Sequence, residues 1–186
     1  MLFRSVYAFQ PRTGKTIWKY QASNRGINTP ALIWQDKVFA GHSEQNAHAD
    51  NVLGAVFAVD GLMTGEIPYD KLLWHIPKLT VGRSAPLLID DRLYFIEDGA
   101  NLVIVDPNTG EEIAEKKLGR IMFGSAVYGD GKIFVGEATG IFQILKPTEK
   151  GVDVLSRVRL NGEEILGSPV ISNGKVLIPT LESLYC

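Results

Sequence analysis

One short phrase recurs four times along the chain and constrains its fold more than any other feature. Each copy consists of a tight turn of Asp or Gly, a basic residue and a run of apolar residues. The basic residues are Lys37, Arg92, Lys132 and Lys175. A period of roughly forty residues, with one longer interval, is typical of proteins built from repeated supersecondary units.

Each repeat carries the pattern of four short strands. An apolar run that starts with small residues or Pro precedes the tight turn, as in residues 84–89, and a third run follows the second, as in residues 102–105. The runs are too short and too rich in β-branched and aromatic residues for helices. A further turn, at residues 10–14, 60–65 and 106–110, leads into a fourth strand. Four strands in about forty residues predict an all-β fold made of antiparallel β-propeller blades.

The spacing predicts about four such blades in one partial domain, residues 1–186. Blade units are expected at residues 28–81, 82–122 and 123–165, with partial units at 1–27 and 166–186 and an insertion loop at 42–53. Both ends fall in a third-strand position, so we expect part of a larger ring of seven or eight blades. A dimer that completes a ring and a small self-contained array of sheets are the alternatives.

Composition narrows the classes of partner. The chain is 45% hydrophobic, which suffices for a globular core, and its formal net charge of −2 comes without a run of like charge. Nucleic acid is therefore not an expected partner. We expect no membrane span, because no apolar stretch approaches the roughly 20 residues that a bilayer requires, and no signal peptide in residues 1–10. The single cysteine, Cys186, excludes an internal disulfide.

The turn and strand pattern resembles the quinoprotein-type repeat of pyrroloquinoline quinone (PQQ) dehydrogenases and of the envelope propeller that assists outer-membrane protein assembly. Residues 6–18 carry the pattern most fully, and residues 55–65 and 103–110 repeat it. The resemblance is closest to the non-enzymatic envelope propellers. It implies a periplasmic, cell-envelope or extracellular location, although the chain alone leaves the compartment unknown.

In this family the Trp after the Thr-Gly turn typically packs between neighbouring blades. Trp18 matches that position directly, Trp74 matches it after a few inserted residues, and Ala114 replaces it in the third copy. The resemblance thus implies a structural, blade-docking role for the Trp residues and for the turn residues that precede them. The complete set is Trp18, Trp74, Gly14, Gly65, Gly110, Asp60 and Asp106.

The sequence supports no catalytic or cofactor site. A quinone-dependent dehydrogenase needs a Ca²⁺ site and a general base, and its alcohol-oxidising relatives commonly carry a vicinal cysteine pair. No residue here matches the cofactor ligands of the family, so neither PQQ nor Ca²⁺ is expected, although both are possible in a complete ring. The insertion holds four residues with metal-binding chemistry, but their spacing matches no metal motif, and a solvated loop is the favoured interpretation. They are His42, Glu44, His48 and Asp50.

Two further features have a binding interpretation beside a structural one. Arg83 begins a strand that would line the central channel, where it could bind an anion or a peptide, although a solvated strand-end charge is the simpler interpretation. Residues 97–99 and 137–140 form acidic turns, which we interpret as hairpin turns rather than cation sites.

The sequence therefore predicts a non-catalytic scaffold or binding module that presents surfaces to a protein or peptide, or to further blades of its own chain. A homodimer is a possible assembly. The alternative is part of a PQQ-dependent oxidoreductase whose cofactor ligands lie in other blades.

Overall fold

The computed structural model describes residues 4–49 and 51–186 and divides the chain into two compact units. Unit 1 comprises the chain up to Gly82 together with the turn Pro107–Gly110, and unit 2 comprises Arg83–Asp106 and Glu111–Cys186. Within the described residues the only helix is the short 3₁₀ turn η1 (Tyr69–Lys71). No helix among the described residues has the length and apolar character needed to cross a membrane.

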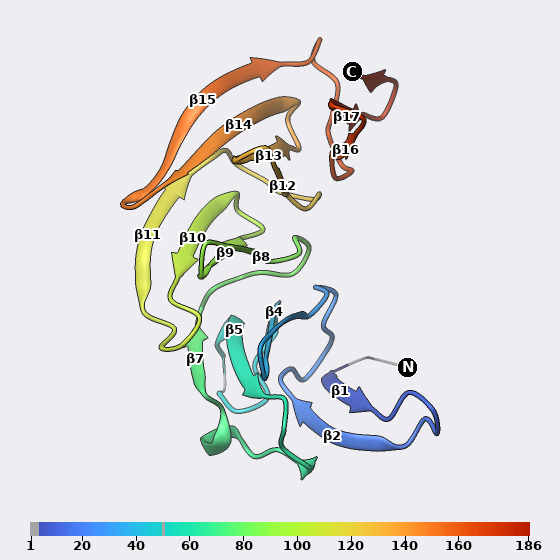
Figure 1. The fold of residues 1–186 in the computed structure, drawn as a ribbon, viewed down its shortest axis with the longest axis vertical. Coiled ribbons are helices and arrows are strands. Elements are labelled where there is room, and N and C mark those ends of the chain that lie inside the picture. The colour runs from blue at the N-terminus through green and yellow to red at the C-terminus, as the bar shows by residue number, and fades with distance from the viewer. Residues whose placement is uncertain (1–3, 50) are drawn as a thin grey trace. The chain divides into compact units, whose positions relative to one another are not determined.

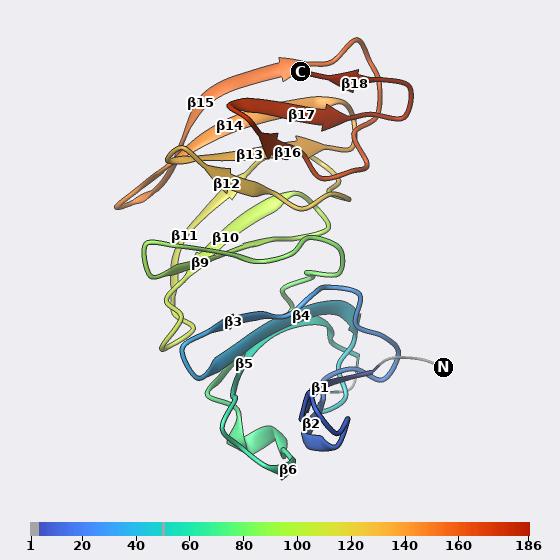
Figure 2. The ribbon, with the colours of Figure 1, turned by 45° about the vertical axis from the view of Figure 1, so that its right-hand side comes forward.

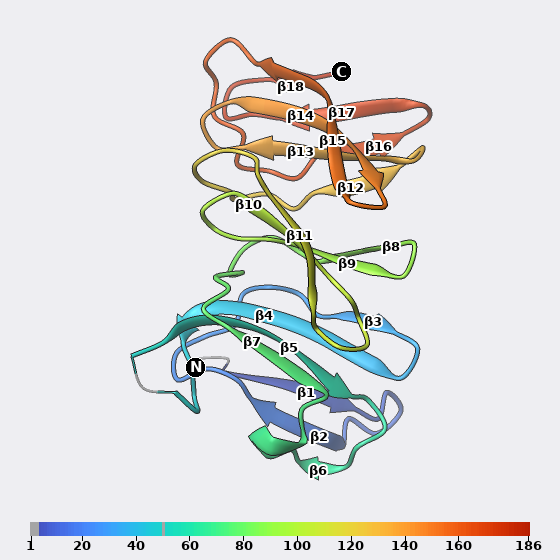
Figure 3. The same cartoon turned by 90° about the vertical axis from the view of Figure 1, so that its left-hand side faces the viewer.

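Unit 1 holds a four-stranded and a three-stranded sheet (Figure 1). The four-stranded sheet has the order β3-β4-β5-β7, and Figure 3 shows β4, β5 and β7 side by side. The three-stranded sheet has the order β1-β2-β6. The strands are β1 (Ser5–Phe9), β2 (Thr16–Gln21), β3 (Leu32–Trp34), β4 (Lys37–Gln45), β5 (Leu53–Asp60), β6 (Gly65–Glu66) and β7 (Trp74–Pro77).

Unit 2 holds two four-stranded sheets and one of three strands (Figure 2). Consecutive strands are hydrogen-bonded neighbours in each sheet, and all the pairings in this unit are antiparallel. The first sheet contains β8 (Leu87–Ile89), β9 (Arg92–Ile96), β10 (Asn101–Val105) and β11 (Glu112–Lys117). The second contains β12 (Val127–Gly129), β13 (Lys132–Glu137), β14 (Ile141–Thr148) and β15 (Gly151–Arg159), and the third β16 (Val170–Ser172), β17 (Lys175–Pro179) and β18 (Leu184–Tyr185).

The recurring turn joins the first and second strands of a sheet because its residues accept a left-handed backbone. Asp130 and Gly131 have φ of 51° and 69°, and Asn173 and Gly174 have 49° and 73°. Two consecutive residues of positive φ are typical of the two-residue hairpin turn whose twist matches that of the strands. The basic residue that follows begins the second strand, as Lys132 does in β13.

Apolar side chains of facing sheets form the cores. In unit 1 a cluster includes Trp18 and Tyr20 of β2 with Phe57 and Val59 of β5. In unit 2 one cluster joins Ile104 of β10 to Ile133 and Leu145 of the next sheet, and a second joins Phe142 to Ile178 of β17. The all-β prediction with four-stranded antiparallel sheets is therefore confirmed, and each sheet is called a blade below.

Two details differ from the expectation. The insertion loop does not begin at residue 42, because β4 continues through Gln45 and pairs its end with Leu53 across an irregularity in the register. The connection between these strands is therefore only residues 46–52. In addition β6, which follows the turn after β5, pairs in parallel with β2 of the preceding blade, whereas the sequence pattern predicted antiparallel pairs only.

Candidate binding site

Each of the two Trp side chains in the predicted docking position contacts a turn that lies far along the chain. Trp18 is 1% exposed and donates from Nε1 to the carbonyl oxygen of Gly61 at 3.0 Å. Trp74 donates in the same way to the carbonyl of Pro107, also at 3.0 Å. Buried indole N–H groups require such partners. The blade-docking role of these residues stays a prediction, and this geometry supports it.

The turn residues of this set have the backbone that their position needs. Gly14, Gly65 and Gly110 all have positive φ, between 69° and 77°, and the Asp60 carboxylate accepts a bond from the N–H of Leu62 at 2.9 Å. The backbone N–H of Asp106 donates to the carbonyl of Glu111 at 2.9 Å and closes the third copy of the turn. Gly110 lies against Trp74, since a Cβ built on it would come within 2.8 Å of the indole ring.

The histidines of the insertion are not arranged as a metal site among the described residues. His42 is 1% exposed within β4, so the solvated-loop interpretation is wrong for this residue. Its Nδ1 lies 3.1 Å from the carbonyl oxygen of Glu44, while Nε2 has no partner within the described residues. Burial lowers the pKa of His42 to about 4. His48 is exposed and contacts the carbonyl of Gln21 at 3.1 Å. Asp50 lies outside the described residues.

Arg83, the predicted channel residue, is exposed and lies over the ring of Phe123 at 4.2 Å from its centroid. Beside it a ladder of hydroxyl groups links the first strands of successive blades. The N–H of Ala85 donates to Ser125 Oγ, and the N–H of Ser125 donates to Ser168 Oγ, both at 2.8 Å. The sequence showed the recurring Ser at the start of each unit, but not that its hydroxyl bonds the neighbouring blade.

The acidic turn at residues 137–140 is a hairpin turn, with the N–H of Gly140 bonded to the carbonyl of Glu137. Its carboxylate is 1% exposed and accepts bonds from the backbone N–H groups of Arg120, Ile121 and Thr139 at 2.9–3.2 Å, and another from the Thr139 hydroxyl. Burial alone would raise the pKa of Glu137, but these donors outweigh burial and hold the pKa below its ordinary value. Glu137 is therefore an ionised anchor for the loop at residues 119–121.

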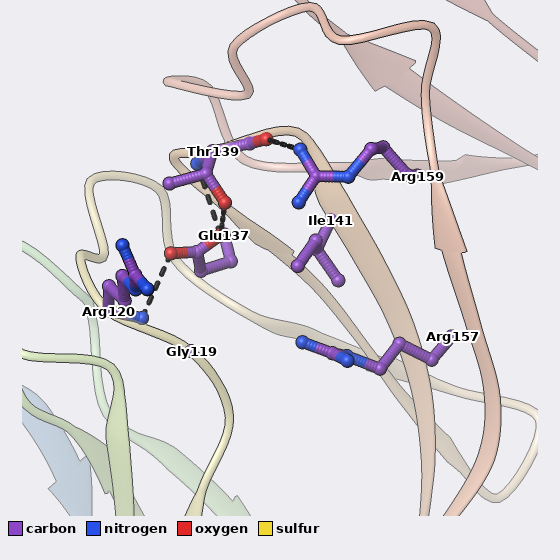
Figure 4. Close-up of a pocket in the computed structure, with 7 residues that line it drawn as sticks. All are labelled: Gly119, Arg120, Glu137, Thr139, Ile141, Arg157 and Arg159. Atoms are coloured by element: carbon purple, nitrogen blue, oxygen red, sulfur yellow. Dashed lines mark hydrogen bonds between the residues drawn. The ribbon is translucent and has the colours of Figure 1, made fainter.

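A pocket of about 320 Å³ opens beside this anchor (Figure 4). Arg157 and Arg159 reach into it from β15, Arg120 borders it from the other side, and Ile141 lies between. Sequence reasoning missed all three arginines, because Arg120 is distant in the chain from Arg157 and Arg159 and the three form no run of charge. Only the alternation at residues 157–159 hinted that two of them share a face of one strand.

An adjoining hollow of about 460 Å³ shares Gly119, Arg120 and Arg157 and adds Lys117. Together the two hollows are lined by four basic side chains and the single acid Glu137. Because the Glu137 carboxylate already accepts four hydrogen bonds, the surplus positive charge faces the open space. We call this region, lined by Lys117, Arg120, Glu137, Arg157 and Arg159, the basic pocket.

Repeated four-stranded blades, with a Trp side chain hydrogen-bonded to a Gly-containing turn, define a β-propeller of the PQQ-repeat type. The chain belongs to the family described as outer membrane protein assembly factor BamB, whose model matches residues 2–126. No curated protein matches the sequence.

Solved structures show the same fold at low sequence identity. BamB from Moraxella catarrhalis is 18% identical with a TM-score of 0.68, and the match covers 96% of this chain and 51% of that one. The WD40 β-propeller domain of Doa1 is 14% identical with a TM-score of 0.68, and the match covers 97% of this chain and 56% of that one. A quinohemoprotein alcohol dehydrogenase from Pseudomonas putida HK5 is 10% identical with a TM-score of 0.64, and the match covers 88% of this chain and 30% of that one. The chain spans about half the length of the BamB that it matches.

Proposed function

We propose that this chain is a non-catalytic propeller module that binds a protein or peptide in the cell envelope. Membership of the BamB family is the observation that carries the proposal, since that family is described as an assembly factor for outer membrane proteins. The blade cores support it physically. Rigid sheets whose interiors are filled with side chains hold the connecting loops in fixed positions, which suits recognition.

Site-specific photo-crosslinking in an envelope extract tests this proposal. A photoreactive amino acid is placed on the exposed positions Arg157, Lys15 and Leu62 in three separate variants. We expect one position to trap a reproducible, small set of envelope proteins that mass spectrometry identifies, because a binding module uses one surface. Trapping of nothing, or of the same abundant proteins at every position, would contradict the proposal.

The same preparation separates this function from the oxidoreductase alternative. The protein is titrated with PQQ and Ca²⁺, and absorbance and dye reduction with alcohols or sugars are followed. We expect no turnover, because no residue of the chain matches the family's cofactor ligands. Substrate-dependent dye reduction would replace the scaffold proposal with the enzymatic one.

A second copy of the chain is the other partner that we consider. Sedimentation at micromolar concentration gives the mass directly. We expect the mass of a single chain if the functional partner is another protein, and a stable dimer would make self-association the leading interpretation.

A further inference from the structure

We propose that the basic pocket of unit 2 binds an extended acidic peptide that carries carboxylates two residues apart. This inference rests on the proposed function and names the chemistry of the partner. The pocket is built from two neighbouring blades of one unit, with Arg120 after β11 and Arg157 and Arg159 on β15.

The first observation is unused hydrogen-bonding capacity. Arg159 donates to the carbonyl oxygen of Thr139 at 2.8 Å. This bond repeats in the preceding blade, where Lys117 donates to the carbonyl of Gly99 at 2.7 Å, so it belongs to the blade architecture. By contrast, the guanidinium groups of Arg120 and Arg157 have no hydrogen-bond or ion-pair partner within the described part of the chain. Two five-donor groups therefore face the same space unpaired.

The second observation is the spacing of the cations. Arg157 and Arg159 are two residues apart on one strand, so they project from the same face at about 7 Å from each other. Their cross-strand partners Gln143 and Ile141 lie on that face too. Carboxylates two residues apart on an extended peptide have the same spacing, and a guanidinium recognises a carboxylate through two parallel hydrogen bonds.

The third observation is that β15 is an edge strand. This strand is the last of its sheet and is hydrogen-bonded to β14 alone. An edge strand presents free backbone groups that an added strand can pair with. The pocket volume of about 320 Å³ is also larger than one carboxylate or phosphate requires. These points favour a peptide over a small inorganic anion.

A binding titration with a defined probe tests the inference. The probe is a fluorescent blocked peptide with the core Thr-Asp-Val-Asp-Thr, and its control has Asn in place of each Asp. We expect the full chain to bind the acidic probe at least tenfold more tightly than the control, with an affinity that falls as salt is raised. Equal affinity for the two peptides overturns the inference.

Paired variants locate the site. The double variant R120Q/R157Q should weaken acidic-probe binding at least tenfold, because it removes the two unpaired guanidiniums. R12Q/K15Q makes the same change of net charge on exposed residues of unit 1 and should leave binding within twofold of wild type. Equal loss in both variants would mean a non-specific charge effect. Circular dichroism checks that each variant is folded. In addition, R157E should bind a peptide with the core Lys-Val-Lys more tightly than wild type does, a gain of binding that unfolding cannot produce.

Three further outcomes distinguish this inference from a small-anion site and from the proposed function. If inorganic phosphate displaces the acidic probe at an equal concentration of anionic groups, the pocket is a small-anion site and the peptide assignment is wrong. A pull-down from envelope extract with the unlabelled chains compares wild type with R120Q/R157Q. If R120Q/R157Q retains the same envelope proteins as wild type, the inference fails while the proposed function stands. If wild type retains no envelope protein but binds the acidic probe, the proposed function fails while the inference stands.

Discussion

At the scale of single residues, positions with the same sequence signal have different packing environments. Gly14 and Gly110 occupy the same place in two copies of one turn and have φ of 69° and 74°. A Cβ on Gly14 would meet nothing within 4 Å, whereas on Gly110 it would lie 2.8 Å from the Trp74 ring. The backbone requirement is thus shared, and the steric requirement belongs to Gly110 alone.

Substitution of both glycines by Ala separates these two requirements. We expect G14A to cost about 1–2 kcal/mol, the strain of a left-handed alanine. G110A should cost a further 1–3 kcal/mol or so, since the indole ring of Trp74 must move to admit the methyl group. Urea unfolding of the two variants measures the difference. Equal costs would show that Trp74 is not held against the turn.

A buried histidine makes stability depend on pH. Burial lowers the pKa of His42 to about 4, from 6.5, so between these values the unfolded chain binds a proton that the folded chain does not. Stability is therefore expected to fall as pH drops below 6.5, by about 1.4 kcal/mol per pH unit, until the folded state also protonates near pH 4.

The variant H42N tests this dependence, because its amide can replace the Nδ1 contact to the Glu44 carbonyl and does not titrate. We expect the slope of unfolding free energy between pH 6.5 and 4.5 to flatten in H42N. An unchanged slope in H42N would assign the pH dependence to other groups.

At the scale of elements, blades are joined near their first strands by side-chain hydroxyls. Ser125 accepts a bond from the N–H of Ala85 in one blade and donates its own N–H to Ser168 Oγ in the next. A recurring small residue is thus also a connector. Loss of the Ser125 hydroxyl leaves the partly buried N–H of Ala85 without an acceptor. An unpaired buried donor costs more free energy than the hydrogen bond itself contributes.

We expect S125A to lower the unfolding free energy by about 1–3 kcal/mol. S172A is a suitable control, because Ser172 is an exposed residue at the end of β16 and its change should cost under about 0.5 kcal/mol. Thermal or urea unfolding followed by circular dichroism measures both. A cost for S125A no larger than that for S172A would exclude a connecting role for the hydroxyl.

At the scale of the whole molecule, the chain consists of two compact units that each have their own apolar clusters. The three Trp residues of the sequence, at positions 18, 34 and 74, all belong to unit 1. Trp fluorescence therefore reports on unit 1, whereas far-UV circular dichroism reports on both. In repeat proteins stability is the sum of local contributions and neighbour contacts.

The variant L145A tests how local the stability is. Leu145 is fully buried in a cluster of unit 2, and truncation should cost about 2–5 kcal/mol. We expect the urea midpoint by circular dichroism to fall more than the midpoint by Trp fluorescence. An equivalent control in unit 1 is F57L. Its destabilisation should shift the midpoint measured by Trp fluorescence at least as much as the midpoint measured by circular dichroism. Identical shifts by the two probes for L145A would show that the units unfold as one.

The amino-acid sequence by itself determined the local architecture of this protein. The turn residues dictate the hairpins because only Gly, Asn and Asp accept positive φ readily, and the apolar runs dictate strands because their length and branching exclude helices. The repeat of these features predicts the blade fold, and the resemblance of the repeat to a known family implies the structural role of Trp18 and Trp74.

The tertiary structure alone decided which distant side chains meet. Whether His42 lies in water or in a core depends on how far β4 extends, and a polar local sequence does not show this. The basic pocket joins residues from two blades, and Glu137 becomes its anchor only because the loop at residues 119–121 turns its N–H groups toward the carboxylate. Such proximity arises from packing between repeats, which no spacing within a repeat encodes.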